Sequence, residues 1–127
     1  MRLLVLGGTA WLGHAIVEEA VHLGHQVTCL ARGDSGPEPA GVGFVRADRE
    51  RADAYDNVAG QLWDAVLDVA RQPGHVRRAV AALEPVAQRY VFVSSGSAYA
   101  SQRELGQDED APLLWPLESD VMESMER

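Results

Sequence analysis

Residues 3–33 are LLVLGGTAWLGHAIVEEAVHLGHQVTCLARG, and this stretch predicts a strand, a glycine turn, a helix and a second strand. Residues 3–6 form a short apolar run, as expected for a strand buried on both faces of a parallel sheet. Apolar residues then recur at helical spacing from Leu12 to Leu23, and Gly24 occupies the position of a left-handed helix cap. Residues 26–31 are the next strand. The chain therefore begins as an α/β sheet does.

The turn between the first strand and the helix has the features of a phosphate-binding turn. Glycines let the backbone approach a pyrophosphate closely, and a helix N-terminus adds unpaired N–H groups and a partial positive charge. A strand precedes these glycines and a helix follows, so the context favours a dinucleotide site over a purely structural turn. The residues expected to contact the cofactor here are Gly7, Gly8, Thr9, Ala10, Trp11, Leu12 and Gly13.

Two motifs, GGTAWLG at 7–13 and VFVSSGSAY at 91–99, resemble the NAD(P)-dependent epimerase/dehydratase family, an extended or atypical branch of the short-chain dehydrogenases/reductases. That family's turn is GxxGxxG, and here Ala10 replaces the middle glycine. The resemblance implies a Rossmann-like, doubly wound parallel sheet with strand order 3-2-1-4-5. It covers nearly all of the chain, but only the cofactor half of a typical member, and stops before the sixth strand and the substrate domain.

The remaining elements follow from apolar spacing and from turn residues. They are predicted at 43–47 (strand), 49–61 (short surface helix), 63–70 (strand), 75–83 (helix) and 90–94 (strand). The surface helix is indicated by the helical spacing of Ala52, Tyr55 and Val58. Pro85 lacks a backbone donor and is expected to end the helix before it.

The residue just past the second strand distinguishes the two nicotinamide cofactors. An acidic side chain there binds the ribose hydroxyls of NAD, whereas an arginine pairs with the 2′-phosphate of NADP. By resemblance the family's acidic residue falls at Ala31, and Arg32 follows it. We therefore expect NADP to be preferred over NAD. The alternative is that Arg32 is a solvated loop residue and Asp34 binds the ribose.

The resemblance assigns two more cofactor contacts. Asp48 matches the aspartate that accepts a hydrogen bond from the adenine amino group, a role that suits an ionised carboxylate. Alternatively, Asp48 caps a helix that starts near Arg49. Val69 and Ala70 stand where the family has small residues that line the cofactor. The neighbouring Arg71 either reaches a phosphate or points to solvent.

Ser95 takes the position of the family's catalytic Ser/Thr, which hydrogen-bonds the substrate carbonyl or alkoxide. Ser97 is a second candidate, and serines that cap the turn are the alternative. Tyr99 belongs to the structural end of this motif. The family's base is the tyrosine of Tyr-x-x-x-Lys, but this sequence has no lysine and no tyrosine beyond Tyr99. The general base is therefore missing from these 127 residues.

Two functional interpretations follow. In the first, residues 1–103 are the NAD(P)-binding domain and 104–127 an acidic tail leading to the missing catalytic helix. The intact oxidoreductase would transfer a hydride to or from a sugar nucleotide or a related carbonyl/alcohol substrate, and this chain alone would be inactive. In the second, the chain is a complete, non-catalytic NADP-binding sensor or interaction module.

Composition and charge limit which binding partners and which cellular compartment are expected. The net charge is −8, and an acidic chain lacks the electrostatic footprint of nucleic-acid binding. No apolar run approaches the ~20 residues of a membrane span, the start does not resemble a signal peptide, and the single cysteine cannot form an internal disulfide. A cytoplasmic location is expected.

The four histidines lack metal-site spacing, so no metal is expected. An apolar set without an evident cover predicts a homodimer: Leu113, Leu114, Trp115, Leu117, Val121 and Met122.

Overall fold

The computed structural model describes residues 1–7, 11–33, 40–95 and 98–122. The elements in chain order are β1 (Arg2–Leu6), α1 (Trp11–His22), β2 (Gln26–Ala31), β3 (Gly43–Arg46), β4 (Ala65–Asp68), α2 (Pro73–Leu83), the 3-10 turn η1 (Glu84–Val86) and β5 (Tyr90–Phe92). A helix separates β1 from β2 and another separates β4 from β5, as in other α/β proteins, whereas no helix lies between β2, β3 and β4 in the described ranges.

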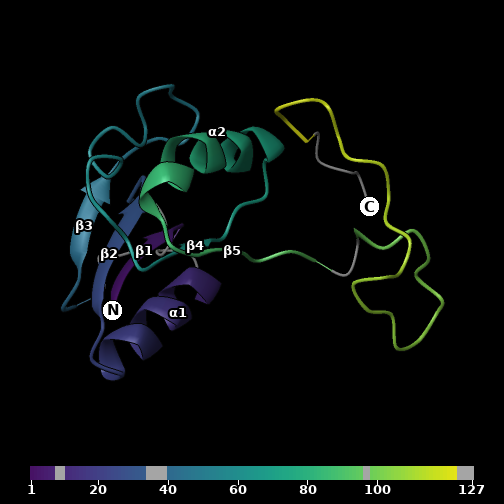
Figure 1. Cartoon of the computed structure of the whole chain (residues 1–127), viewed down its shortest axis with the longest axis horizontal. Coiled ribbons are helices and arrows are strands. Elements are labelled where there is room, and N and C mark those ends of the chain that lie inside the picture. The colour runs from purple at the N-terminus through teal and green to yellow at the C-terminus, as the bar shows by residue number, and fades with distance from the viewer. Residues whose placement is uncertain (8–10, 34–39, 96–97, 123–127) are drawn as a thin grey trace.

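The five strands form one parallel sheet in the order β3-β2-β1-β4-β5, which confirms the predicted arrangement (Figure 1). The central strand β1 pairs with both β2 and β4, so that Val5 lies between Cys29 and Leu67. Residues 3–6 are buried, as the uninterrupted apolar run predicted. Because all strands are parallel, their carboxyl ends meet at one edge, where ligands bind in open α/β sheets.

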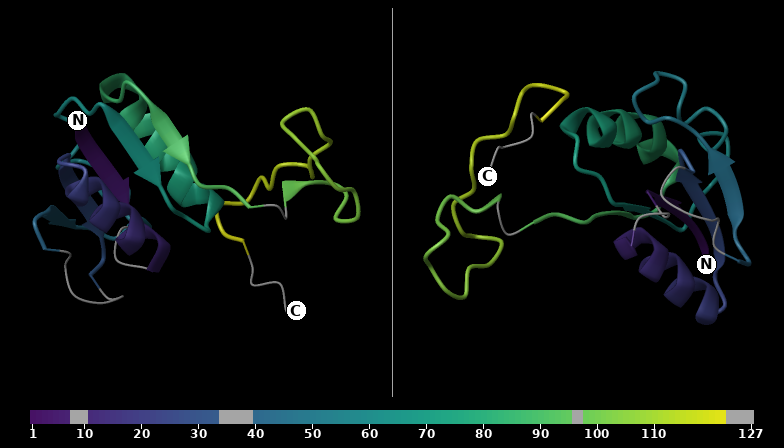
Figure 2. Two further views of the ribbon diagram at one scale, coloured as in Figure 1. Left: turned by 90° about the horizontal axis from the view of Figure 1, so that it is seen from below. Right: turned by 180° about the vertical axis from the view of Figure 1, so that it is seen from behind.

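The two helices lie on opposite faces of this sheet (Figures 1 and 2). On one face, Val17 and Ala20 of α1 pack on Leu3 and Val5 of β1. On the other face, α2 packs on the intervening residues; that cluster includes Leu4, Leu6, Leu30, Val66, Ala79 and Leu83. Successive strand residues point to opposite faces, so β1 contributes to both clusters.

Both helices end for local reasons that the sequence predicted. The backbone N–H of Gly24 donates to the carbonyl of Val21 at 3.0 Å, and Gly24 has a φ of +85°, as in a left-handed cap. The second helix stops at Leu83, and Pro85 lies in the 3-10 turn that follows. It begins at Pro73, two residues earlier than predicted, because proline is well suited to the first turn of a helix.

The predicted surface helix at 49–61 was wrong. This segment is a series of turns, closed by bonds such as that from the N–H of Val58 to the carbonyl of Tyr55 at 3.0 Å. The indole N–H of Trp63 binds the Val58 carbonyl at 2.9 Å and so occupies an acceptor that a longer helix would use. Tyr55 and Val58 are buried as their spacing predicted, but Ala54 is buried in place of Ala52.

The three later strands are shorter than predicted, and the chain leaves the sheet after Phe92 (Figures 1 and 2). The segment beyond it projects away from the sheet and is closed by an antiparallel bridge between Tyr99 and Leu113. The chain then returns to the N-terminal end of α2. The division of the chain at residues 103 and 104 stays a prediction.

Gly7 follows β1 and lies against the ends of β2 and β4. Its backbone N–H donates to the carbonyl of Leu30 at 2.9 Å, and its φ of +89° is rare for other residues. A Cβ at this position would lie 2.6 Å from the carbonyl oxygen of Val69. Two independent constraints therefore require glycine here.

Gly7→Ala is expected to lower the free energy of unfolding by at least about 2 kcal/mol, because it adds both backbone strain and a clash. The matched control is Gly24→Ala, which has a φ of +85° and nothing within 4 Å of its Cβ position. That control should cost only the strain, about 1 kcal/mol. Urea unfolding followed by circular dichroism measures both. Equal losses would show that the contact with Val69 does not matter.

Candidate functional site

A hollow of about 510 Å³ opens at the carboxyl edge of the sheet. Its volume is within the range of small-molecule sites. Its walls include Gly7 after β1, Arg32 after β2, Asp48 after β3, and Val69 and Ala70 after β4. The structure thus brings together predicted cofactor residues from four different strand ends.

Other predicted site residues lie elsewhere. Trp11, Leu12 and Gly13 form the first turn of α1 and do not line this hollow; the Trp11 side chain is 83% exposed. Ser95 is exposed beyond the end of β5, and its carbonyl accepts a bond from the N–H of Ala98 at 3.1 Å. Outside the described residues lie Gly8, Thr9, Ala10, Asp34 and Ser97.

The side chain of Asp48 has one oxygen engaged. Its Oδ1 accepts a hydrogen bond from the backbone N–H of Glu50 at 2.9 Å, so Asp48 closes a turn at the start of the 49–61 segment. Its Oδ2 has no hydrogen-bond partner among the residues that the structure describes. The helix that Asp48 was expected to cap is absent, so this carboxylate closes a turn instead, and its role as a contact for an exocyclic amine stays a prediction.

A buried ion pair lies beneath the hollow. Asp68, the last residue of β4, is fully buried, and Arg49 is 7% exposed. Arg49 binds both carboxylate oxygens, with Nη1–Oδ1 at 2.7 Å and Nη2–Oδ2 at 3.0 Å. This two-point geometry is the strongest form of an arginine–carboxylate pair.

Three further contacts extend this pair into a network. Arg49 Nε donates to the hydroxyl of Tyr55 at 2.8 Å, and its Nη2 donates to the carbonyl of His75 at 3.2 Å. The hydroxyl of Tyr90 donates to Asp68 Oδ2 at 2.5 Å. The network therefore joins the loop after β3, the end of β4, the start of α2, and β5.

The same surroundings shift the pKa values of the neighbouring groups. Burial, together with the hydrogen bond to Asp68, raises the pKa of the Tyr90 hydroxyl, which therefore stays protonated and donates. Burial, and next the charge of Arg49, lower the pKa of His75, which lines the hollow. The imidazole is therefore harder to charge than an exposed histidine.

Sequence reasoning missed this network. Arg49 entered the sequence analysis only as the start of a predicted helix, and Asp68 only as part of the predicted strand at 63–70. Nineteen residues separate the two, so no local spacing marks the pair. The one available signal was an acidic residue in a strand that is otherwise apolar on both faces, since such a charge needs a buried partner.

Arg49→Met is expected to lower the free energy of unfolding by about 3–5 kcal/mol, because it leaves a buried carboxylate unpaired. The double variant Arg49→Met/Asp68→Leu should recover much of that loss, since it removes both charges. Urea unfolding measures all three proteins. Arg51→Met is the control, because the ion pair of Arg51 with Asp53 is exposed and should contribute little. A double variant no more stable than Arg49→Met would refute this account.

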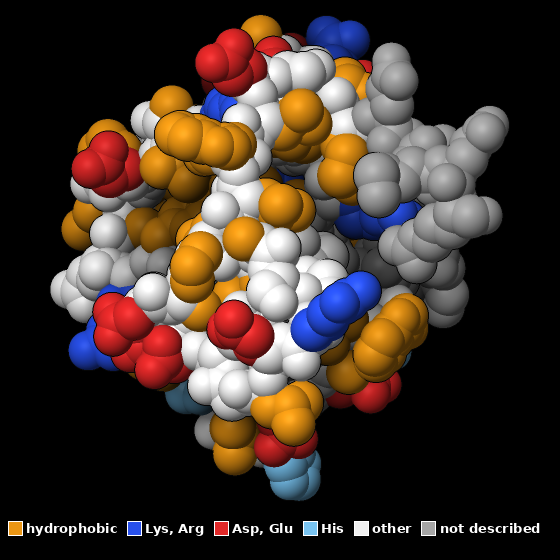
Figure 3. All heavy atoms as spheres, turned by 90° about the vertical axis from the view of Figure 1, so that its right-hand side faces the viewer, with side chains coloured by type: hydrophobic (Ala, Val, Ile, Leu, Met, Phe, Trp, Pro, Cys, Tyr) orange, Lys and Arg blue, Asp and Glu red, His pale blue; other side chains and the backbone are white. Residues whose placement is uncertain are grey.

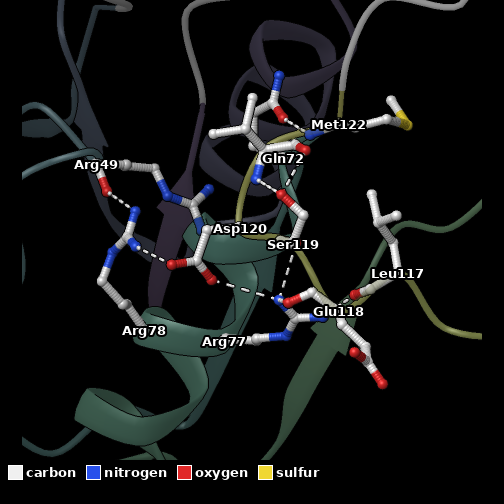
Figure 4. Close-up of polar contacts among 10 residues, drawn as sticks. Arg49, Gln72, Arg77, Arg78, Leu117, Glu118, Ser119, Asp120 and Met122 are labelled. Atoms are coloured by element: carbon white, nitrogen blue, oxygen red, sulfur yellow. Dashed lines mark hydrogen bonds and ion pairs between the residues drawn. The ribbon is translucent and has the colours of Figure 1, made fainter.

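Residues 117–122, which we call the strap, dock on the N-terminal end of α2 (Figure 4). The guanidinium of Arg77 donates to the carbonyls of Leu117, Glu118 and Ser119 and to the carboxylate of Asp120. One arginine side chain thus binds four consecutive residues.

The helix end adds backbone contacts to the strap. The N–H of Gly74 donates to the carbonyl of Asp120 at 2.9 Å, and the side chain of Gln72 accepts a bond from the N–H of Met122 at 2.7 Å. A Cβ on Gly74 would lie 2.7 Å from the Cβ of Asp120, so glycine permits this close approach. Gln72 also lines the hollow, so the strap borders the candidate site.

A further contact links the strap to the buried pair. Asp120 Oδ2 lies 3.6 Å from Nη1 of Arg78, and Nη2 of Arg78 donates to the backbone carbonyl of Arg49 at 3.0 Å (Figure 4). The polar contacts therefore run continuously from the strap to Arg49 and on to Asp68.

Arg77→Gln is expected to release the strap, because the shorter neutral side chain cannot keep the carbonyl contacts. A glutamate-specific protease should then cleave after Glu118 about fivefold faster or more, if about 1 kcal/mol of docking is lost. Cleavage after Glu109 in the same digest is the internal control, and mass spectrometry measures both rates. If the ratio of the two rates does not change, Arg77 does not hold the strap.

Apolar side chains are exposed along the C-terminal segment. On the face that carries this segment, hydrophobic side chains lie among acidic ones (Figure 3). The most exposed are Leu105 and Trp115, at 97% and 95%. The predicted set from Leu113 to Met122 is exposed or nearly so throughout. Across the described ranges, no helix has the length and apolar character needed to cross a membrane.

Comparisons with known proteins agree with this geometry. The sequence profile of the NAD dependent epimerase/dehydratase family matches residues 3–87, which contain all of the residues that line the hollow. A search of curated proteins finds no match. Many solved structures are similar to this chain.

Three of those structures illustrate the likeness. A UDP-galactose 4-epimerase shares 18% identity with a TM-score of 0.78, over 90% of this chain and 45% of that chain. A Methylobacillus flagellatus protein assigned to the NAD-dependent epimerases/dehydratases shares 28% identity with a TM-score of 0.71, over 88% and 43%. An Agrobacterium tumefaciens short-chain dehydrogenase/reductase with bound NAD shares 23% identity with a TM-score of 0.75, over 90% and 39%. This chain spans less than half the length of each.

Proposed function

Because this chain belongs to the NAD-dependent epimerase/dehydratase family, we propose that it is the cofactor-binding part of an oxidoreductase and that it prefers NADP to NAD. The observation that carries the proposal is the hollow at the carboxyl edge, where Gly7, Arg32, Asp48, Val69 and Ala70 meet. This is the place and the set of residues that the family resemblance implies for a dinucleotide.

The residues present fit such a cofactor. Gly7 keeps the first strand end free of a side chain, as a pyrophosphate requires. Asp48 has a carboxylate oxygen available as an acceptor for the adenine amino group. Arg32 and Arg71 line the hollow and supply donors suited to phosphates. Val69 and Ala70 are small enough to lie against a flat ring.

The proposed reaction is hydride transfer on a sugar nucleotide or a related carbonyl/alcohol substrate. The bound nicotinamide supplies the hydride acceptor or donor. Ser95 would hold the reacting oxygen through its hydroxyl, which both donates and accepts. The substrate pocket and the proton-transfer group would come from residues outside this sequence, with 1–103 as the cofactor domain and 104–127 leading onward. Such a group contributes about 10²–10⁴ in rate, so we expect negligible turnover from this chain alone.

One observation favours a second candidate function, a non-catalytic NADP-binding module. The sequence has no lysine and no tyrosine beyond Tyr99, so it lacks the family's catalytic pair. The exposed apolar side chains of the C-terminal segment would then serve a partner, and a second copy of this chain is the simplest one. The intact mass of the native gene product separates the two: a value well above 13.8 kDa supports the enzyme, and 13.8 kDa supports the module.

Titration of the chain with each cofactor tests the preference. NADP is expected to bind about tenfold more tightly than NAD, as a charge-assisted contact to the 2′-phosphate would give. Arg32→Ala should weaken NADP binding and leave NAD binding nearly unchanged. Arg89→Ala is the matched control, because Arg89 precedes β5 at the opposite edge of the sheet. Isothermal calorimetry measures the six binding constants of the three proteins for the two cofactors, and NAD binding at least as tight as NADP to the unchanged chain would refute the preference.

A further inference from the structure

A second hollow, of about 450 Å³, adjoins the first at the carboxyl edge of β3. The two share Arg32, Ala47 and Asp48, so they form one continuous recess. The second adds Arg46, the last residue of β3, and Arg51 in the turn that follows. Three arginines therefore surround the outer part of the candidate cofactor site.

The charges of these arginines are not equally available. Arg51 is paired with the carboxylate of Asp53 at 3.0 Å. Arg46 has no carboxylate within the 4.0 Å of an ion pair in the described ranges of the chain. Its Nη1 donates to the backbone carbonyl of Arg32 at 3.0 Å, which fixes the guanidinium. Its remaining N–H groups have no acceptor among the described residues, and the side chain is exposed.

The sheet places Arg46 beside the position that contacts the ribose. In the register of β2 and β3, Arg46 is the partner of Ala31, which stands where the family's acidic residue binds ribose hydroxyls. The two strands remain paired here, since the N–H of Ala47 donates to the carbonyl of Ala31 at 3.0 Å. The methyl group of Ala31 leaves room that a longer acidic side chain would fill. A 2′-phosphate on a ribose bound at this position would therefore have Arg46 as its neighbour on the adjacent strand.

Gly33 makes this placement possible. A Cβ on Gly33 would lie 2.9 Å from Cζ and from Nη2 of Arg46, so the guanidinium occupies the space that any other residue would use. Gly33 also has a φ of +85°, which turns the chain away after Arg32. The absence of a side chain at 33 thus positions the cation of Arg46 against the turn.

We propose that Arg46 is the main ligand of the 2′-phosphate of NADP, with Arg32, which lines both hollows, as a second contact. This inference rests on the proposed function, because it assigns the phosphate end of the same cofactor site. A guanidinium held by one nitrogen presents its other nitrogens as a planar fork, which matches two phosphate oxygens. Arg46 lies within a strand, so the sequence alone marked only Arg32.

Two nucleotides that differ only in the 2′-phosphate test this assignment: adenosine 2′,5′-bisphosphate and adenosine 5′-monophosphate. Calorimetry on the whole chain is expected to show tighter binding of the bisphosphate. Arg46→Gln should weaken bisphosphate binding about tenfold, the effect of one lost charge-assisted contact. Binding of the monophosphate should stay within about twofold. The loss should shrink at high salt, where the charge is screened.

Two further variants separate position from charge. Gly33→Ala should displace the guanidinium and weaken bisphosphate binding in the same direction, although the arginine is still present. Arg89→Gln should change neither affinity, and melting temperatures of all variants show whether each is folded. If the bisphosphate binds no more tightly than the monophosphate, or if Arg46→Gln keeps the preference, the assignment is wrong while the cofactor site stands. If neither nucleotide binds, the proposed function itself fails and the assignment fails with it.

Discussion

The buried carboxylate of Asp68 is the constraint on which the carboxyl edge of this sheet depends. Removing a charge from water is costly unless it is paired and hydrogen-bonded. Asp68 meets that requirement with both arms of the Arg49 guanidinium and with the hydroxyl of Tyr90. Arg49 in turn binds Tyr55 and the start of α2. The contacts that satisfy this one charge thus join four segments next to the hollow.

The elements that the sequence predicted well are those determined by near neighbours. The apolar run at 3–6, the glycines at 7 and 24 and the proline at 85 each act within a few residues, so their outcome does not need the rest of the fold. The helix predicted at 49–61 was wrong because interactions with residues outside a helical turn compete with it. Arg49 binds the buried Asp68, and the indole of Trp63 donates to the Val58 carbonyl. Helical spacing still identified Tyr55 and Val58 as buried, because both side chains pack in the core on one face of the sheet, whereas Ala52 is exposed.

The residues of the candidate site also separate into those that local sequence predicts and those that it does not. Residues directly after strands were predictable, because parallel strands bring their carboxyl ends to one edge. Arg46, Gln72 and His75 were not, because their place in the two hollows depends on strand register and on where α2 begins. The strap was also beyond prediction: Arg77 meets residues about forty positions later, and nothing in either segment alone marks the other. Local sequence patterns therefore do not predict the long-range polar contacts of this molecule.

The contacts from Asp120 through Arg78 to Arg49 couple ligand binding in the hollow thermodynamically to docking of the strap. If a ligand in the hollow favours the ordered form of the loop after β3, the same loop presents the Arg49 carbonyl to Arg78 and so favours a docked strap. Linkage makes this effect reciprocal: docking of the strap would strengthen ligand binding by the same free energy. A change in residues 98–116 that alters docking of the strap would then change cofactor affinity, although these residues line neither hollow.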